Sequence, residues 1–254
     1  MQISARSLVL KIIICIILIM LLIGVLLKWG VPAAVEKVAA QLPENSIAEL
    51  GNQSQNYVFT LTEKSHLPIQ QQQQIRNDYL NMFAGQHPAT LIFRQGDRIG
   101  ANALALPNNT IIVTDELIEM AHSDQEILGV LAHEQGHLVK RHSLQQALSH
   151  LGLGVIYIAL TGKHTDALND LPVQFLGASY SRQFEQEADL YALNMMQKNH
   201  LQTSHYANFL QRMSDENNET KQLNTQPDFL SSHPTTEKRI QMVRDFEAEQ
   251  SIPK

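Results

Sequence analysis

The chain has 254 residues, of which 44% are hydrophobic and 17% are charged, and its formal net charge at pH 7 is −6. This length suits one compact domain with additions, and an acidic chain lacks the broad cationic face that a nucleic-acid backbone requires, so no nucleic-acid partner is expected. A single cysteine, Cys15, excludes an intrachain disulfide and a cysteine-based zinc cluster, so any metal must be held by histidines and carboxylates.

The first predicted element is a transmembrane helix over residues 8–27. This stretch is apolar except for Lys11, and a helix of this length spans roughly 30 Å, the hydrocarbon thickness of a bilayer. Lys28 and Trp29 suit an interface, so we expect residues 1–30 to remain as an anchor, with a cleaved signal peptide as the alternative. The excess of positive charge before the span predicts a single-pass protein of a cell inner membrane whose remainder faces the periplasm.

A membrane-proximal connector is expected over residues 31–66, with a strand-like run at 57–61. The catalytic domain is expected over residues 67–254. Its first helix is predicted at residues 68–83, because Pro68 suits the first position of a helix.

A β-hairpin is predicted next. Residues 103–106 and 110–114 are β-prone, and the Pro107-Asn108-Asn109 link between them suits a turn, since asparagine tolerates a positive φ.

Helices dominate the rest of the chain. Ser123 and Glu126 form a capping box that predicts a long helix ending near residue 149. The apolar residues 151–160 are too few to span a bilayer and predict a buried helix or a flap near the site, with dipping into the membrane as the lesser alternative. Three further helices are predicted at residues 173–198, 203–213 and 235–249.

The first long helix carries the sequence His133-Glu134-Gln135-Gly136-His137, an H-E-x-x-H pattern. Its two histidines lie one turn apart on one face, so both imidazoles can bind one ion. Glu134 points about 100° away from His133, where it can reach a water near the metal and act as general base. The surrounding helix is apolar, and a metal would compensate the cost of burying these polar groups.

The third ligand is sought in the second long helix. The apolar stripe of this helix faces the core, and Glu185 lies about 60° from the centre of that stripe, closer than Glu187. Glu185 is therefore the better inward ligand. Asp189, one turn further, is predicted to accept a hydrogen bond from the free N–H of a ligating histidine. With His133, His137 and Glu185, a zinc ion keeps an open fourth position, which suits hydrolysis.

His233 is a further candidate, as a hydrogen-bond donor to the oxyanion, because Pro234 restricts its backbone; an ordinary loop histidine is the alternative. His142 falls about 140° round the helix from His137, and we do not expect it to be a ligand.

Several segments together carry a family resemblance. They are residues 102–107, 113–117, 131–137 with 141–142, 180–189, 232–234 and 239–240. In these segments the chain resembles the M48 zinc metallopeptidases, which are gluzincins. The resemblance implies that Glu185 is the third zinc ligand, and that His233 and Arg239 are active-site residues, as oxyanion stabiliser or as a gate on the zinc. It also implies that the hairpin at residues 103–114 is an edge strand to which an extended peptide substrate adds by main-chain hydrogen bonds.

The sequence thus predicts a mainly helical α+β fold, with a gluzincin-type metallopeptidase domain, a small β-hairpin or sheet and one N-terminal transmembrane helix. The predicted function is a zinc endopeptidase, with one zinc per chain, that hydrolyses misfolded or misassembled cell-envelope proteins; the substrate class follows from the family alone. The alternative is a chaperone-like or assembly-binding module with a latent zinc site. A purely structural zinc, which four protein ligands would close, is a third possibility.

Overall fold

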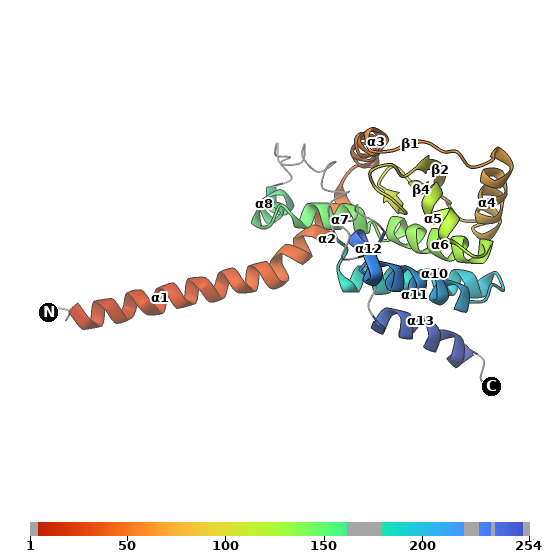
Figure 1. Ribbon diagram of the computed structural model, residues 1–254. Coiled ribbons are helices and arrows are strands. Elements are labelled where there is room, and N and C mark those ends of the chain that lie inside the picture. The colour runs from red at the N-terminus through yellow and green to blue at the C-terminus, as the bar shows by residue number, and fades with distance from the viewer. Residues whose placement is uncertain (1–4, 162–178, 221–228, 235–236, 251–254) are drawn as a thin grey trace.

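The computed structural model describes residues 5–161, 179–220, 229–234 and 237–250. A helical rod opens the chain, in which α1 (Ala5–Val25) continues through the π-helical turn η1 (Leu26–Gly30) into α2 (Val31–Gln41). Figure 1 shows α1 projecting away from the other elements. Within the described residues, Leu8–Gln41 is the one helix long and apolar enough to cross a membrane, and its most apolar window is 0% buried.

The strand predicted at residues 57–61 of the connector is wrong, because a helix extends to Thr60. This helix is α3 (Glu44–Thr60), whose buried residues recur at helical spacing. They are Ile47, Gly51, Ser54 and Val58. Burial of this face outweighs the local β preference of the β-branched and aromatic residues at the end of the segment.

A mixed four-stranded sheet has the order β1-β2-β4-β3. Its strands are β1 (Glu63–Lys64), β2 (Thr90–Gln95), β3 (Ala103–Leu106) and β4 (Thr110–Thr114). The predicted hairpin is confirmed, since β3 and β4 pair antiparallel and Asn109 in the turn has a φ of 58°. β2, which was not predicted, runs parallel to β4 and leaves β3 at the edge of the sheet.

The predicted first helix of the domain is confirmed as α4 (Ile69–Met82), and a short helix, α5 (Asp115–Met120), follows β4. The Ser123 side chain caps α6 (Asp124–Val139) as expected.

The helix predicted to continue to residue 149 is interrupted. Arg141 is left-handed, with a φ of 54°, and α7 (His142–Ser149) begins after it. The guanidinium of Arg141 donates a hydrogen bond of 2.9 Å to the carbonyl of Ala39 in α2. The break turns the apolar face of α7 onto α2, a long-range contact that local helix propensity does not encode.

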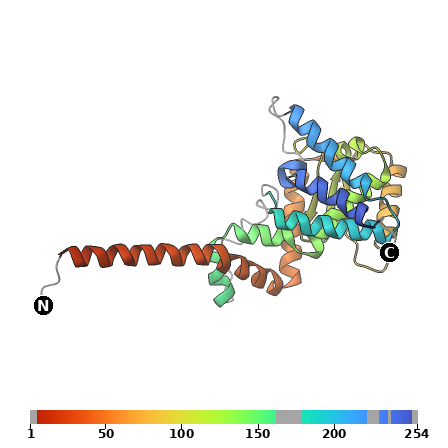
Figure 2. The same cartoon turned by 90° about the horizontal axis from the view of Figure 1, so that it is seen from below.

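The remaining described helices are α8 (Leu153–Thr161), α10 (Arg182–Lys198), α11 (Ser204–Thr220), α12 (Phe229–Ser232) and α13 (Glu237–Gln250). The helix predicted at 173–198 begins only at residue 182, because Ser181 is extended and its side chain caps the helix. Residues 173–178 lie outside the described part. Ile158 of α8 is buried against α2 while Leu160 is exposed, and Figure 2 shows α8 beside the junction of α1 and α2.

Helix α6 occupies the centre of the domain. The sheet lies on one side of it and α10, α11 and α13 lie on the other, as Figure 1 shows. The largest core cluster joins all of these elements with α4. A second cluster joins α2 and the start of α3 with α7 and α8. The mainly helical fold with a small mixed sheet confirms the predicted α+β class.

Candidate metal centre

The candidate ligands from the two long helices meet in the interior. His133 and His137 lie one turn apart on α6, and Glu185 lies in the first turn of α10, which packs along α6. His233, directly after α12, joins them, so that all four donor atoms lie within 4.8 Å of one another. Each of the four side chains is fully buried. The structure therefore brings together residues up to 100 positions apart.

Close approach of the two helices depends on a residue without a side chain. A Cβ atom at Gly136 would lie 3.1 Å from the Cα of Ala188. The glycine of the H-E-x-x-H motif therefore lets the backbone of α10 come near enough for Glu185 to reach the histidines.

Distances within the cluster match a tetrahedral zinc site. The Nε2 atoms of His133 and His137 lie 3.0 Å apart, and Glu185 Oε1 lies 3.3 Å from His137 Nε2. His233 Nδ1 lies 3.3 Å from His133 Nε2 and 3.1 Å from Glu185 Oε1. A tetrahedral zinc with ligands at about 2.0–2.1 Å separates its donors by roughly 3.3–3.4 Å. The residues present fit the metal, with His233 as a fourth donor in this conformation.

The protonation states of His137 and Glu185 suit the binding of a cation. Burial lowers the pKa of His137 well below its usual value, so the imidazole is neutral and can offer a lone pair. Burial would raise the pKa of Glu185, but the neighbouring His233 and His137 outweigh it and hold that pKa well below its usual value. A neutral imidazole beside an ionised carboxylate is the donor set that zinc binding requires.

Glu134 lies beside the cluster without being one of its donors. Its carboxylate is buried, and His233 Nε2 lies 3.4 Å from Oε1. Burial raises the pKa of Glu134 above its usual value, although His233, His133 and the backbone of Ala105 act in the opposite direction. A buried carboxylate of increased basicity suits a general base.

An ion network holds the outer nitrogen of His133. Its Nδ1 lies 2.9 Å from Asp189 Oδ1, which also accepts a hydrogen bond of 2.8 Å from the Tyr206 hydroxyl. Arg239 donates two hydrogen bonds of 2.7 Å to the Asp189 carboxylate and pairs with Glu185 through Nη1. The predicted contact between Asp189 and a ligating histidine is thus present. Arg239, predicted at the active site, lies behind the two carboxylates.

His137 is held through a different chain of contacts. Its Nδ1 lies 3.0 Å from Nδ1 of His142, whose Nε2 lies 3.5 Å from Glu187 Oε2. The His142 ring stacks on Phe184 at 4.2 Å between centroids. His142 is not one of the donors, as expected, but its contact with His137 was not foreseen. The break after α6 places it there, which no helical-wheel argument anticipates.

Sequence reasoning did not identify two further residues at the site, Tyr180 and Ser143. Tyr180 stacks on His137 at 4.0 Å between ring centroids. Its hydroxyl lies 2.8 Å from Ser143 Oγ, which in turn donates a 2.8 Å hydrogen bond to the carbonyl of Ala105 in β3. These side chains lie between the histidines and the edge strand. Tyr180 is the first residue of one of the segments that carry the family resemblance. That resemblance indicates that Tyr180 lies near the site, but it does not predict the stack on His137.

Comparison with known proteins gives a consistent result. The family model described as "Peptidase family M48" matches residues 69–247. Mitochondrial metalloendopeptidase OMA1 of Saccharomyces cerevisiae is 32% identical over 148 residues, which are 55% of this chain and 41% of that protein. Metalloprotease YcaL of Escherichia coli is 28% identical over 151 residues, 57% of each chain.

A third relative is the beta-barrel assembly-enhancing protease of Yersinia pestis, which is 26% identical over 158 residues, 57% of this chain and 32% of that protein. The chain therefore spans only about a third to three-fifths of the length of these curated relatives.

Proposed function

Since the chain belongs to peptidase family M48, we propose that it is a zinc-dependent endopeptidase, anchored by α1, that cleaves misfolded or misassembled proteins of the cell envelope. One observation carries the proposal. The buried donors of His133, His137 and Glu185 converge on one point, and a further buried acidic side chain, Glu134, lies beside them without being one of the donors. A structural site needs no such carboxylate, whereas hydrolysis does.

In the proposed reaction, His133, His137 and Glu185 hold the metal. When bound, zinc supplies Lewis acidity that polarises a carbonyl and a water. Glu134 removes the proton of the attacking water and delivers it to the nitrogen of the leaving amine. Burial raises the pKa of Glu134, which makes the carboxylate a better base for the first transfer and keeps the carboxylic acid protonated until the second.

His233 has two positions in this proposal. With Nδ1 in the donor cluster, it occupies the place that water or substrate needs. Withdrawn from the cluster, its ring can donate a hydrogen bond to the developing oxyanion. Asp189 and Arg239 orient the ligands from behind and are positioning residues.

Substrate binding as an extended strand is proposed at β3. This strand lies at the edge of the sheet, and the Ala105 carbonyl points away from β4 toward Ser143. A peptide that replaced the Ser143 hydroxyl on this carbonyl would add a strand beside the zinc ligands.

Location and biological role rest on other observations. The length and exposure of α1 support an anchor, and the charges around it favour an inner membrane with the domain in the periplasm. The name of the Yersinia pestis relative, a beta-barrel assembly-enhancing protease, supports a role in envelope quality control.

The observation of His233 within the cluster favours a second candidate, a binding or chaperone-like module whose zinc is latent. Glu134→Gln separates the two. For a peptidase, the full chain in detergent loses at least about 100-fold of its casein hydrolysis while its zinc content stays at one per chain. Casein hydrolysis that survives the substitution would contradict the assigned base, and an intact cellular role without hydrolysis would support the module.

A further inference from the structure

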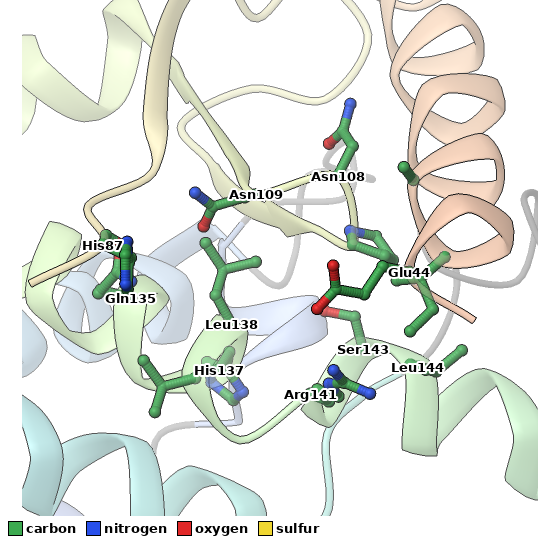
Figure 3. A pocket seen from close by; sticks show the side chains of 14 residues that line it. Glu44, His87, Asn108, Asn109, Gln135, His137, Leu138, Arg141, Ser143 and Leu144 are labelled. Atoms are coloured by element: carbon green, nitrogen blue, oxygen red, sulfur yellow. The ribbon is translucent and has the colours of Figure 1, made fainter. Parts of the chain in front are cut away.

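A pocket of about 470 Å³ lies beside the C-terminal end of α6. Figure 3 shows it between the connector helix α3, the turn of the β3–β4 hairpin, and the residues that lead from α6 into α7. Its lining includes Ile47 and Ala48 from α3, together with His137 and Leu144 from the catalytic side. The cavity is therefore shared between the connector and the zinc-binding part of the chain.

The connector is a fixed wall of this pocket. Arg141 ties the α6–α7 break to the end of α2, and Ile47 belongs to the same buried cluster as Leu144 of α7. At the other end of the wall, a Cβ atom at Gly51 would lie 2.2 Å from the backbone nitrogen of Asn108. The hairpin turn thus rests directly on α3. Residues 44–51 lie outside the region that the family model matches, 69–247, so this wall belongs to a segment beyond the shared domain.

The position of the pocket relates it to the proposed path of the substrate. Ser143, at the pocket, hydrogen-bonds to Ala105 in the edge strand. Pro107 and Asn108, which also line the pocket, follow directly where β3 ends. His137 belongs to both the pocket and the metal cluster. A peptide paired along β3 would therefore pass the pocket close to the metal cluster.

The chemistry of the lining selects a class of side chain. Ile47, Ala48, Leu138 and Leu144 form an apolar part of the lining, beside polar residues such as Asn108. Figure 3 shows the Glu44 side chain extending from α3 into the pocket, and Arg141 lines it as well, so the lining carries no net charge that would select a charged side chain.

We propose that this pocket, completed by the connector helix α3, binds a large apolar side chain of the peptide substrate near the scissile bond and makes the connector a determinant of specificity. This inference rests on the proposed peptidase function. Peptide binding can nevertheless be measured without peptide cleavage.

The direct test uses the full chain in detergent with Glu134→Gln as the background, so that bound peptide is not consumed. Two fluorescein-labelled decapeptides of glycine, serine and threonine are compared, one with a central phenylalanine and one with alanine there. We expect the phenylalanine peptide to bind at least about tenfold more tightly by fluorescence anisotropy. Ala48→Phe fills the pocket and should remove this difference. Equal binding of both peptides, or a preference that survives Ala48→Phe, overturns the inference.

Ser46→Phe is the matched control. Ser46 is exposed on α3 and lies about 160° round the helix from Ala48, so the same ring is added away from the pocket. The preference should be unchanged in this variant. If Ala48→Phe does not fold, Ala48→Leu applies the same test with less added bulk, and circular dichroism and zinc content establish that each variant is intact.

Casein cleavage by the chain without Glu134→Gln then links the pocket to the reaction. Sites flanked by large apolar residues should lose at least about tenfold in rate with Ala48→Phe, relative to sites flanked by small residues. Phenylalanine-selective binding without any cleavage would leave the pocket in place and contradict the proposed peptidase activity. Cleavage with an unchanged site preference would contradict the pocket alone.

Discussion

His133 and His137 are equivalent in the motif, but the residues behind them differ. Behind His133, Asp189 is fully buried and its carboxylate is saturated by charged and neutral donors. Behind His137, the support passes through His142 to Glu187, whose side chain is 34% exposed. Water can replace a lost group on the exposed side but not on the buried side. The core therefore holds the candidate ligand His133 rigidly, while the candidate ligand His137 is supported from the surface.

The largest effect is expected from Arg239→Met. It leaves the carboxylates of Asp189 and Glu185 buried without their cation, which typically costs about 3–5 kcal/mol. The melting temperature of the chelator-treated chain should fall by roughly 10 °C. Arg244→Met, at an exposed position on the same helix, should change stability by no more than about 0.5 kcal/mol. Equal stability of the two variants would contradict a buried ion network behind His133.

Asp189→Asn should have the next largest effect. The amide keeps the size of the side chain but removes the negative charge that holds the N–H of His133, so zinc affinity should fall by about 10–100-fold. Competition with a chromophoric chelator measures the change. Asp245→Asn, at an exposed position, is the control and should bind zinc like the unmodified chain. An unchanged affinity in Asp189→Asn would remove the role of that carboxylate in orienting His133.

His142→Phe should have the smallest effect of the three. The new ring can keep the stack on Phe184 but cannot accept a hydrogen bond from His137, and we expect zinc affinity to fall by no more than about tenfold. Glu187→Gln should change it by less than about twofold, because a partly exposed carboxylate contributes little. A loss in His142→Phe as large as that in Asp189→Asn would show that the two sides are equivalent after all.

Sequence reasoning succeeded for groups whose relation is set within one helix. The spacing of His133 and His137 and the inward face of Glu185 follow from the helical repeat, and the capping of α6 by Ser123 follows from the local Ser-x-x-Glu motif; the structure contains each of them. It failed where a contact between distant segments overrides a local preference. The end of α3 is helical despite its β-prone residues, and the helix of the motif breaks at Arg141.

The residue types and their helical spacing were enough to predict a zinc site of histidines and a carboxylate, and the family resemblance added His233 and Arg239 to the active site. Their exact places came from the tertiary fold, which sets His233 among the donors, Arg239 against Asp189, Tyr180 on His137, and the connector at the neighbouring pocket. The physical reason is that helical geometry fixes neighbours three or four residues apart. Partners separated by tens of residues are chosen by burial, charge pairing and packing of the whole chain.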